Sequence, residues 1–323
     1  MSEPTPRLNL IQRVMQKTAL GGARIIGLEP PQTDSGEMHP QPVANNTVAK
    51  IAPAKSSTSH EVQLDYAKLR DARVVTPSDR KSWTYNEFRA VKRKLLPMAR
   101  AKDSAGNAQN IVMVTSALPG EGKTFTSINL AIGLAAESNL EVILVDGDAT
   151  RCSAGQHFRG NRDKGLIDLL TDTAGLSIDD VLHSCSDLPN LHVMFSGKRD
   201  DTAPELFASK RMADICDALA KRFAQSIVII DTPPVLAAAE PVALVPHIDH
   251  VLMVVAGGTS GRHQIEEALT TLASCRSISL LFNKAPKWQR THFGSYYYYG
   301  YGIGENSPAE DPADQDTPLR QAK

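Results

Sequence analysis

The stretch Ile111–Thr124, IVMVTSALPGEGKT, decides the fold of this chain. It opens with Ile111–Val114, a short apolar and mostly β-branched run without charge, which is typical of a strand buried on both faces. The glycine-bearing loop Ala117–Lys123 comes next, and apolar residues at helical spacing continue to Ala135. Strand, loop, Lys-Thr and helix in this order predict a phosphate-binding P-loop. The alternative is a structural strand–turn–helix that contains Gly-Lys-Thr by chance.

The loop residues have distinct expected tasks. Backbone amides of the loop and of the helix N-terminus present N–H donors to an anion. Lys123 adds a positive charge, and the Thr124 hydroxyl is placed to reach a Mg²⁺ ion. One departure is that Ala117 holds the position of the first glycine in G-x-x-x-x-G-K-[ST]. We expect a nucleotide to be bound by the following residues: Pro119, Gly120, Glu121, Gly122, Lys123, Thr124 and Phe125.

Aspartates follow two further apolar strands. Val142–Val145 leads to Asp146 and Asp148, and Ile227–Ile230 leads to Asp231. Ligands bind outside the carboxyl ends of the strands in open α/β sheets, so these carboxylates are expected beside the P-loop. A strand that ends in Asp is how P-loop enzymes commonly hold Mg²⁺, usually through water. A turn without function is the alternative for the first pair of aspartates.

Strands and helices alternate through the rest of the chain. The expected elements are a GLIDLL segment at Gly165–Leu170, a strand at Leu191–Phe195, a helix at Pro204–Phe223, a strand at Val251–Val255, a helix at Arg262–Ala273 and a strand at Ile278–Phe282. This alternation predicts an α/β P-loop NTPase with a mostly parallel, doubly wound sheet flanked by helices. Asn283, directly after the last strand, is expected to contact the base of the nucleotide.

Composition limits the partners and the surroundings of the protein. The 35 Lys and Arg residues nearly balance the 36 Asp and Glu residues, which gives no support for nucleic acid as a main partner. The four cysteines are scattered without a C-x-x-C pair, which fits a reducing cytosol with neither a disulfide framework nor a metal site. No apolar run approaches the ~20 residues of a spanning helix, and the N-terminus lacks a signal-peptide core. We therefore expect a soluble, cytoplasmic protein.

The N-terminal region is expected to differ from the P-loop domain. Residues 7–18 place apolar residues at helical spacing between basic ones, which predicts a helix that either docks on a partner or membrane or frays in solution. Glu29–His60 is rich in Pro, Ser, Thr, Asn and Gln and is expected to be a disordered linker, with order resuming near Glu61. The expected domains are residues 1–80 (short helix and linker), 81–287 (P-loop domain) and 288–323 (flexible tail).

An amphipathic helix is expected over Thr84–Met98, with Pro97 marking its end. Its apolar residues, which fall close to one face, are Tyr85, Phe88, Val91, Leu95 and Leu96. The charged remainder is Arg89, Lys92, Arg93 and Lys94. These basic residues predict either a solvated face or a contact between subunits.

Tyrosines are concentrated near the C-terminus. Five of the seven tyrosines of the chain are Tyr296, Tyr297, Tyr298, Tyr299 and Tyr301. Glycines flank and interrupt this run, and polar, acidic sequence follows to Lys323, so a flexible and exposed tail is the more consistent interpretation. A packing strand or an exposed aromatic patch is the alternative.

Three motifs and the tyrosine cluster together carry a family resemblance. They are S-A-L-P-G-E-G-K-T at 116–124, I-L-V-D-G-D-x-x-R at 143–151 and I-I-D-T-P-P at 229–234. In this order they resemble the bacterial tyrosine kinases (BY-kinases), which are autophosphorylating kinases of exopolysaccharide systems. The basic N-terminal helix and the YYYYGYG tail are most similar to the tyrosine autokinases associated with exosortase (PEP-CTERM) loci. The resemblance covers roughly Thr84–Tyr301.

The resemblance implies a mechanism, cofactors and partners. Lys123 would bind the β- and γ-phosphates of ATP, Thr124 would ligate Mg²⁺, and Asp148 and Asp231 would hold the ion through waters. Asp146 would orient or deprotonate the incoming tyrosine hydroxyl. The tail tyrosines would be phosphorylated between subunits of a homo-oligomer. Further implied partners are a transmembrane polysaccharide co-polymerase, which would recruit the kinase to the inner face of the plasma membrane, and a tyrosine phosphatase.

Two departures and two alternatives stand beside this resemblance. The family's oligomerisation signature E-x-x-R-x-x-R is matched only loosely, by Asn86, Arg89 and Lys92. Arg151 lies one residue later than in many members, and Cys152 follows where proline is common.

A positioning ATPase resembling the ParA/MinD group is the main alternative. That group has a lysine early in the loop, whereas no lysine precedes Lys123 in the loop of this chain, and it leaves the tyrosine tail unexplained. A non-catalytic subunit that signals ATP occupancy is the other alternative.

Overall fold

The computed structural model describes residues 24–26, 60–79, 82–137, 140–171 and 175–285. The helix expected over residues 7–18, nearly all of the expected linker and the tyrosine-rich tail lie outside these residues. Within them, no helix is both long and apolar enough to cross a lipid bilayer.

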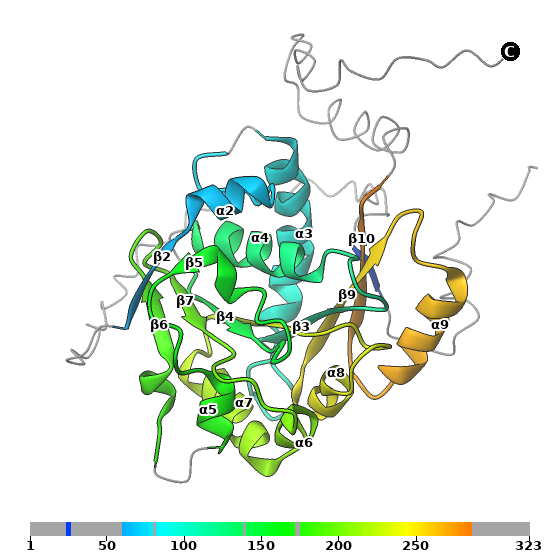
Figure 1. Ribbon diagram of the computed structural model, residues 1–323. Coiled ribbons are helices and arrows are strands. Elements are labelled where there is room, and N and C mark those ends of the chain that lie inside the picture. The colour runs from blue at the N-terminus through cyan, green and yellow to red at the C-terminus, as the bar shows by residue number, and fades with distance from the viewer. Residues whose placement is uncertain (1–23, 27–59, 80–81, 138–139, 172–174, 286–323) are drawn as a thin grey trace, which may run out of the picture. The chain divides into compact units, whose positions relative to one another are not determined.

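A largely parallel sheet forms the centre of the described part (Figure 1). Its strands are β1 (Arg24–Ile26), β2 (Glu61–Leu64), β3 (Ile111–Ser116), β4 (Val142–Asp146), β5 (Phe158–Arg159), β6 (Leu182–Cys185), β7 (Leu191–Met194), β8 (Ile227–Asp231), β9 (His250–Ala256) and β10 (Ile278–Asn283). Their order is β1-β10-β9-β3-β8-β4-β7-β6-β2-β5. The pairs β6–β7 and β2–β5 are antiparallel, and the other neighbours are parallel. The expected mostly parallel sheet is confirmed.

The central strands are apolar because helices cover both of their faces. Successive residues of a strand point to opposite faces, so Ile111 and Met113 enter one hydrophobic cluster while Val112 and Val114 enter another. All residues of β3, β4, β8 and β9 are buried. Continuous apolar runs of this kind are the signature of parallel strands that no solvent reaches.

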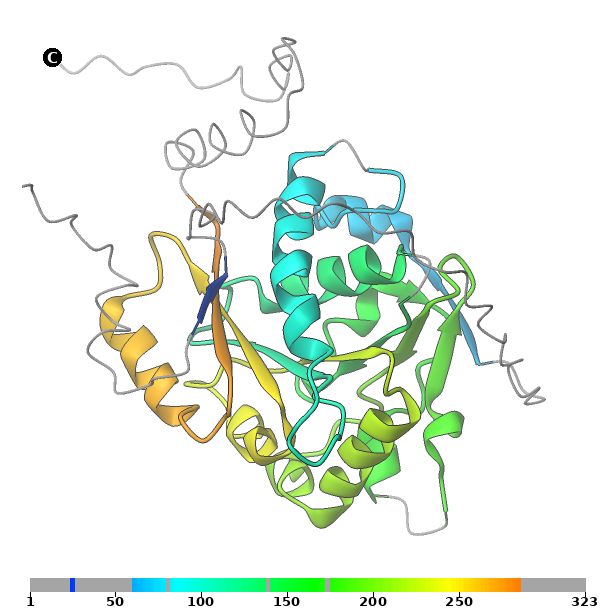
Figure 2. The same cartoon turned by 180° about the vertical axis from the view of Figure 1, so that it is seen from behind.

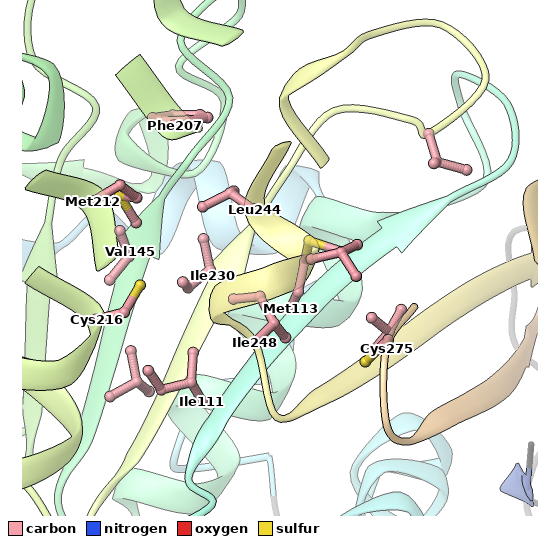
Figure 3. Close-up of a cluster of buried hydrophobic side chains, with 14 of the residues drawn as sticks. Ile111, Met113, Val145, Phe207, Met212, Cys216, Ile230, Leu244, Ile248 and Cys275 are labelled. Atoms are coloured by element: carbon pink, nitrogen blue, oxygen red, sulfur yellow. The ribbon is translucent and has the colours of Figure 1, made fainter. Parts of the chain in front are cut away.

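Helices divide between the two faces, as Figure 1 and the reverse view in Figure 2 show. The first group is α2 (Tyr66–Asp71), α3 (Trp83–Ala99) and α4 (Lys123–Ala135). The second group is α5 (Leu166–Thr171), α6 (Ala203–Phe207), α7 (Lys210–Arg222), α8 (Glu240–Leu244) and α9 (Arg262–Thr271). Short 3₁₀ helices lie at Gly155–His157, Ile178–Asp180 and Val245–His247. Figure 3 shows part of the core of the second face, where Phe207, Met212 and Leu244 join Met113 and Ile230.

The single helix expected over Pro204–Phe223 is wrong, because two helices occupy this segment. α6 ends at Phe207, whose side chain is fully buried, and α7 begins at Lys210. Between them Ser209 is extended, and its side chain accepts a hydrogen bond from the Met212 amide as the N-cap of α7. Serine competes in this way with the regular helical bonds and favours caps.

The helix expected over Thr84–Met98 exists as α3, but two details of the expectation are wrong. Pro97 lies inside the helix, which continues to Ala99. Lys92 does not belong to the exposed charged remainder, since only 3% of it is exposed. Arg89 and Arg93 are exposed, as expected.

The described chain continues from His60, and its next elements join the sheet. β2 pairs with β6, and α2 places Leu69 in the hydrophobic cluster of the first face. Both precede the domain boundary expected at residue 80. β1, which lies in the region expected to contain only a helix and a linker, pairs with β10.

Candidate active site

The P-loop joins β3 to α4, and its glycines have a backbone conformation that other residues rarely adopt. Gly120 and Gly122 have φ angles of 82° and 98°, and Gly122 is the N-cap residue of α4. Ala117, which replaces the first glycine of the motif, is fully buried in the core of the second face. The departure at this position is therefore compatible with a well-packed loop.

Strand register brings the predicted aspartates to the P-loop. β8 lies between β3 and β4, and Asp146 at the end of β4 is paired in register with Asp231 at the end of β8. Asp148 follows β4 by two residues, and its Oδ2 lies 3.2 Å from the Nζ of Lys123. The side chains of Lys123 and Asp148 are 10% and 1% exposed, so this ion pair is largely shielded from solvent.

Asp231 is fully buried beside this ion pair. Its Oδ1 accepts a hydrogen bond from Ser127 Oγ at 3.0 Å, whereas its Oδ2 has no hydrogen-bond partner among the described residues. Burial raises the pKa of Asp231 to about 6, and the positive charge of Lys123 opposes that rise. An orphaned buried carboxylate oxygen is costly unless a cation or water binds to it.

Asp146 is held in a fixed orientation by its own loop. Its Oδ2 accepts from the Gly155 amide at 3.0 Å, and its Oδ1 accepts from the Asp148 amide at 3.3 Å. Burial raises the pKa of Asp146 to about 7, and the nearby charge of Asp231 adds to the rise. A carboxylate with a pKa near neutrality is suited to accept a proton at physiological pH.

Two serine hydroxyls that no sequence motif singled out, those of Ser127 and Ser153, belong to the same cluster. Thr124 Oγ1 lies 3.0 Å from Ser153 Oγ, and Ser127 Oγ lies within 3.0 Å of both the Lys123 carbonyl and Asp231. Thr124 and Ser153 are 29 residues apart in sequence, so no local pattern connects them. Ser127, one turn after Lys123 in α4, could have been found from the i, i+4 spacing of a helix.

Apart from Gly122, the N-cap of α4, the expected nucleotide-binding residues fall into three groups. Pro119 and Gly120 are exposed, and Lys123 and Thr124 lie with the aspartates. Glu121, Phe125 and Asn283 have side chains engaged within the protein. The Glu121 carboxylate accepts from the Leu118 amide at 2.8 Å, and the Phe125 ring packs edge-on against Phe88 of α3. Asn283 Nδ2 donates to the Glu121 carbonyl at 2.9 Å, so Asn283 lies against the P-loop.

The oxygen atoms around Lys123 suit a magnesium ion that keeps most of its waters. Within the described ranges, no group of three His, Cys, Asp or Glu side chains is close enough to hold a metal by itself. Mg²⁺ commonly keeps several waters and takes only one or two protein ligands together with substrate phosphates. The Thr124 hydroxyl and the orphaned Oδ2 of Asp231 fit that mode of binding. The expected acceptor tyrosines, residues 296–301, lie outside the described part of the chain.

Several known proteins are similar to this chain in sequence or in fold. The AAA domain family AAA_31 matches residues 109–279. The tyrosine-protein kinase CpsD of Streptococcus pneumoniae is 32% identical over 205 residues, which are 61% of this chain and 86% of CpsD. EpsB of Ralstonia solanacearum is 33% identical over 214 residues, which are 64% of this chain but only 28% of EpsB. The kinase domain of the Escherichia coli tyrosine kinase ETK superposes with a TM-score of 0.53 at 24% identity, over 63% of this chain and 78% of that domain.

Proposed function

Since this chain belongs to the bacterial tyrosine-protein kinases and to the AAA_31 domain family, we propose that it is an ATP-dependent protein-tyrosine kinase. The observation that carries the proposal is the buried cluster in which Lys123 pairs with Asp148 beside Asp146 and Asp231. Phosphoryl transfer requires mainly that the protein positions the reacting groups and balances charge. The P-loop lysine among three carboxylates can position the phosphates and balance their charge.

ATP binding is assigned to the P-loop and to the ion pair. The γ- and β-phosphates would replace Asp148 as the partner of the Lys123 ammonium, while the loop amides donate to the phosphate oxygens. Thr124 would bind Mg²⁺ directly, and Asp148 and Asp231 would bind it through waters. A bound Mg²⁺ ion would neutralise charge on the transferring phosphoryl group.

Asp146 is the proposed proton acceptor for the substrate. A tyrosine hydroxyl has an ordinary pKa of ~10, so its attack on phosphorus is assisted by a nearby carboxylate. The tyrosine oxygen would bond to the γ-phosphorus as the bond to the β–γ bridging oxygen breaks, ADP would leave, and the proton would pass to Asp146. The pKa of Asp146, raised to about 7 by burial, suits this task.

The proposed substrates are Tyr296–Tyr299 and Tyr301 of a neighbouring copy. Their segment follows β10, whose end contacts the P-loop through Asn283. Each phosphate would add a charge of about −1.5 to −2, and repulsion between adjacent phosphates would loosen a homo-oligomer. The family resemblance supports regulation of exopolysaccharide synthesis, a transmembrane co-polymerase as partner at the inner membrane face, and a tyrosine phosphatase that reverses the modification.

The competing function is a positioning ATPase without kinase activity. Counted back from Lys123, the position of that group's signature lysine is held by Leu118, whose amide donates to the Glu121 carboxylate at 2.8 Å. A leucine has no ammonium, so the loop lacks the second positive charge that the signature lysine would bring to the phosphates. This argues for the kinase over the ATPase.

The proposed function is tested by incubation with Mg·ATP followed by peptide mass spectrometry. We expect phosphate on Tyr296–Tyr299 or Tyr301, and none in a Lys123→Met variant incubated alone. Mixing the Lys123→Met chain with an active chain that lacks residues 288–323 should label the tail of the Lys123→Met chain. Nucleotide hydrolysis without any tyrosine phosphate would support the positioning ATPase instead. Phosphate only on Tyr66 or Tyr85 would contradict the proposed use of the tail as substrate.

A further inference from the structure

Glu121, in the middle of the P-loop, has a carboxylate that is held by neutral donors. The residue is only 3% exposed. Its Oε2 accepts from the Leu118 amide at 2.8 Å, and its Oε1 accepts from the hydroxyl of Ser260. None of the ion pairs within the described ranges involves Glu121. A buried carboxylate without a cation depends on its hydrogen bonds, so each of these donors matters for the loop.

Ser260 is well placed to be such a donor. It lies in the loop between β9 and α9, and its oxygen accepts from the Ala256 amide at 2.8 Å. A hydroxyl has one proton and two acceptor lone pairs, so a lone pair that faces Ala256 leaves the proton for Glu121. Because Ala256 ends β9, the serine connects the P-loop to a rigid strand of the sheet.

Asn283 supports the same turn from the end of β10. Its Nδ2 donates to the Glu121 carbonyl at 2.9 Å, and its own carbonyl accepts from the Gly257 amide at 2.8 Å. A Cβ atom added to Gly122 would lie 2.1 Å from Asn283 Nδ2, so the asparagine packs directly on the loop backbone. Residues at or just after the ends of β9 and β10 therefore contact Glu121 and Gly122 of the P-loop.

We propose that Ser260 is a positioning residue of the nucleotide site, acting through the Glu121 carboxylate. The Leu118–Glu121 and Glu121–Ser260 hydrogen bonds fix the course of the backbone from Leu118 to Lys123, and with it the direction of the amides that bind phosphate. Preorganised donors bind an anion more strongly than mobile ones, because no ordering is required at the moment of binding. This role deepens the proposed function and rests on its nucleotide binding.

The test measures the Kd for ADP by calorimetry in EDTA, so that metal binding does not contribute. Ser260→Ala should weaken ADP binding by about tenfold, as expected for one lost hydrogen bond to a charged group. Ser260→Thr, which keeps the hydroxyl, should restore most of the affinity. Ser209→Ala removes a similarly half-buried hydroxyl that caps α7, and it should leave the Kd unchanged.

A double-mutant cycle separates this role from general destabilisation. In a Glu121→Ala background, Ser260→Ala should have no further effect on the Kd, because the group it positions is gone. Unchanged ADP affinity in Ser260→Ala, or full additivity in the cycle, overturns the proposal. If the unmodified chain binds no nucleotide, the proposed function itself fails. If the unmodified chain binds ADP and Ser260→Ala binds it with the same Kd, the proposed function stands and only the role of Ser260 is disproved.

Discussion

The ammonium of Lys92 in α3 lies 2.6 Å from the carbonyl oxygen of Gly133 in the last turn of α4. The last four carbonyls of a helix have no partner within the helix, and a cation at this end is favourable. Lys92 also bonds to Glu137 at 2.9 Å and lies over the ring of Tyr85. Since α4 begins with the P-loop lysine, Lys92 fastens α3 to the helix that carries the nucleotide site.

Replacing Lys92 by Met should destabilise the fold. The substitution keeps most of the side-chain volume but leaves the Gly133 carbonyl without its donor, so the free energy of unfolding should fall by about 1–3 kcal/mol. Urea denaturation measures this change. Arg89→Met, on the exposed side of the same helix, is the matched control and should change the stability by less than about 0.5 kcal/mol. Equal effects of the two substitutions would show that the buried contact adds nothing.

Lys92 also shows why the exposure of a charged residue is hard to predict from the sequence. The buried residues of α3 are Phe88, Lys92, Leu95 and Ala99, which follow the i, i+4, i+7, i+11 spacing of one helical face. The charge of a lysine predicts a place on the polar side of the helix, whereas the position of Lys92 in this stripe predicts burial. The long aliphatic stem of lysine allows it to lie along an apolar surface when its ammonium finds an acceptor.

The centre of the fold and much of the site were predictable because their signals are local. β3, the P-loop and the strands that end at Asp146 and Asp231 each depend on a few adjacent residues. Ser153 and Ser260 could not be predicted, since they meet the P-loop from 29 and 139 residues away. The two-residue β5 was missed as well, because a strand this short has no pattern.

The ion pair between Lys123 and Asp148 predicts a nucleotide-dependent stability. Asp148→Asn keeps an oxygen for the Arg151 amide but removes the charge opposite a mostly buried ammonium. Breaking such pairs costs up to about 3–5 kcal/mol, and less where another carboxylate such as Asp231 is near. ADP phosphates should then replace the missing charge. We expect a lower melting temperature for the nucleotide-free variant and a larger rise on adding ADP in EDTA than for the unmodified chain.

Lys123→Met provides the reference for that experiment. It has no ammonium to be paired, so ADP should raise its melting temperature little or not at all. A rise in Asp148→Asn that is no larger than in the unmodified chain would contradict the proposed exchange of partners. That result would leave the ion pair as a structural feature without a part in nucleotide binding.

The raised pKa of Asp146 predicts how stability depends on pH. Its pKa is about 7 in the folded protein, owing first to burial and then to Asp231, against an ordinary value of 3.8. Between these values the folded chain holds a proton that the unfolded chain has lost. Stability from this group is therefore greatest at low pH and is lost as the pH rises through about 7.

Asp146→Asn isolates this contribution, because the amide does not titrate. The variant loses one acceptor, either for Gly155 or for Asp148, which lowers its stability by a constant amount at every pH. The free energy of unfolding of the variant is expected to lie below that of the unmodified chain, and this difference should shrink steadily from pH 5 to pH 7.5. Urea denaturation with EDTA present measures it. In contrast, Asp180→Asn should give a constant difference over this range. Bonds from Ser177 lower the pKa of Asp180, so this carboxyl is ionised in both states above pH 5. A deficit for Asp146→Asn that stays constant as well would mean that Asp146 is ionised throughout and does not store a proton near neutral pH.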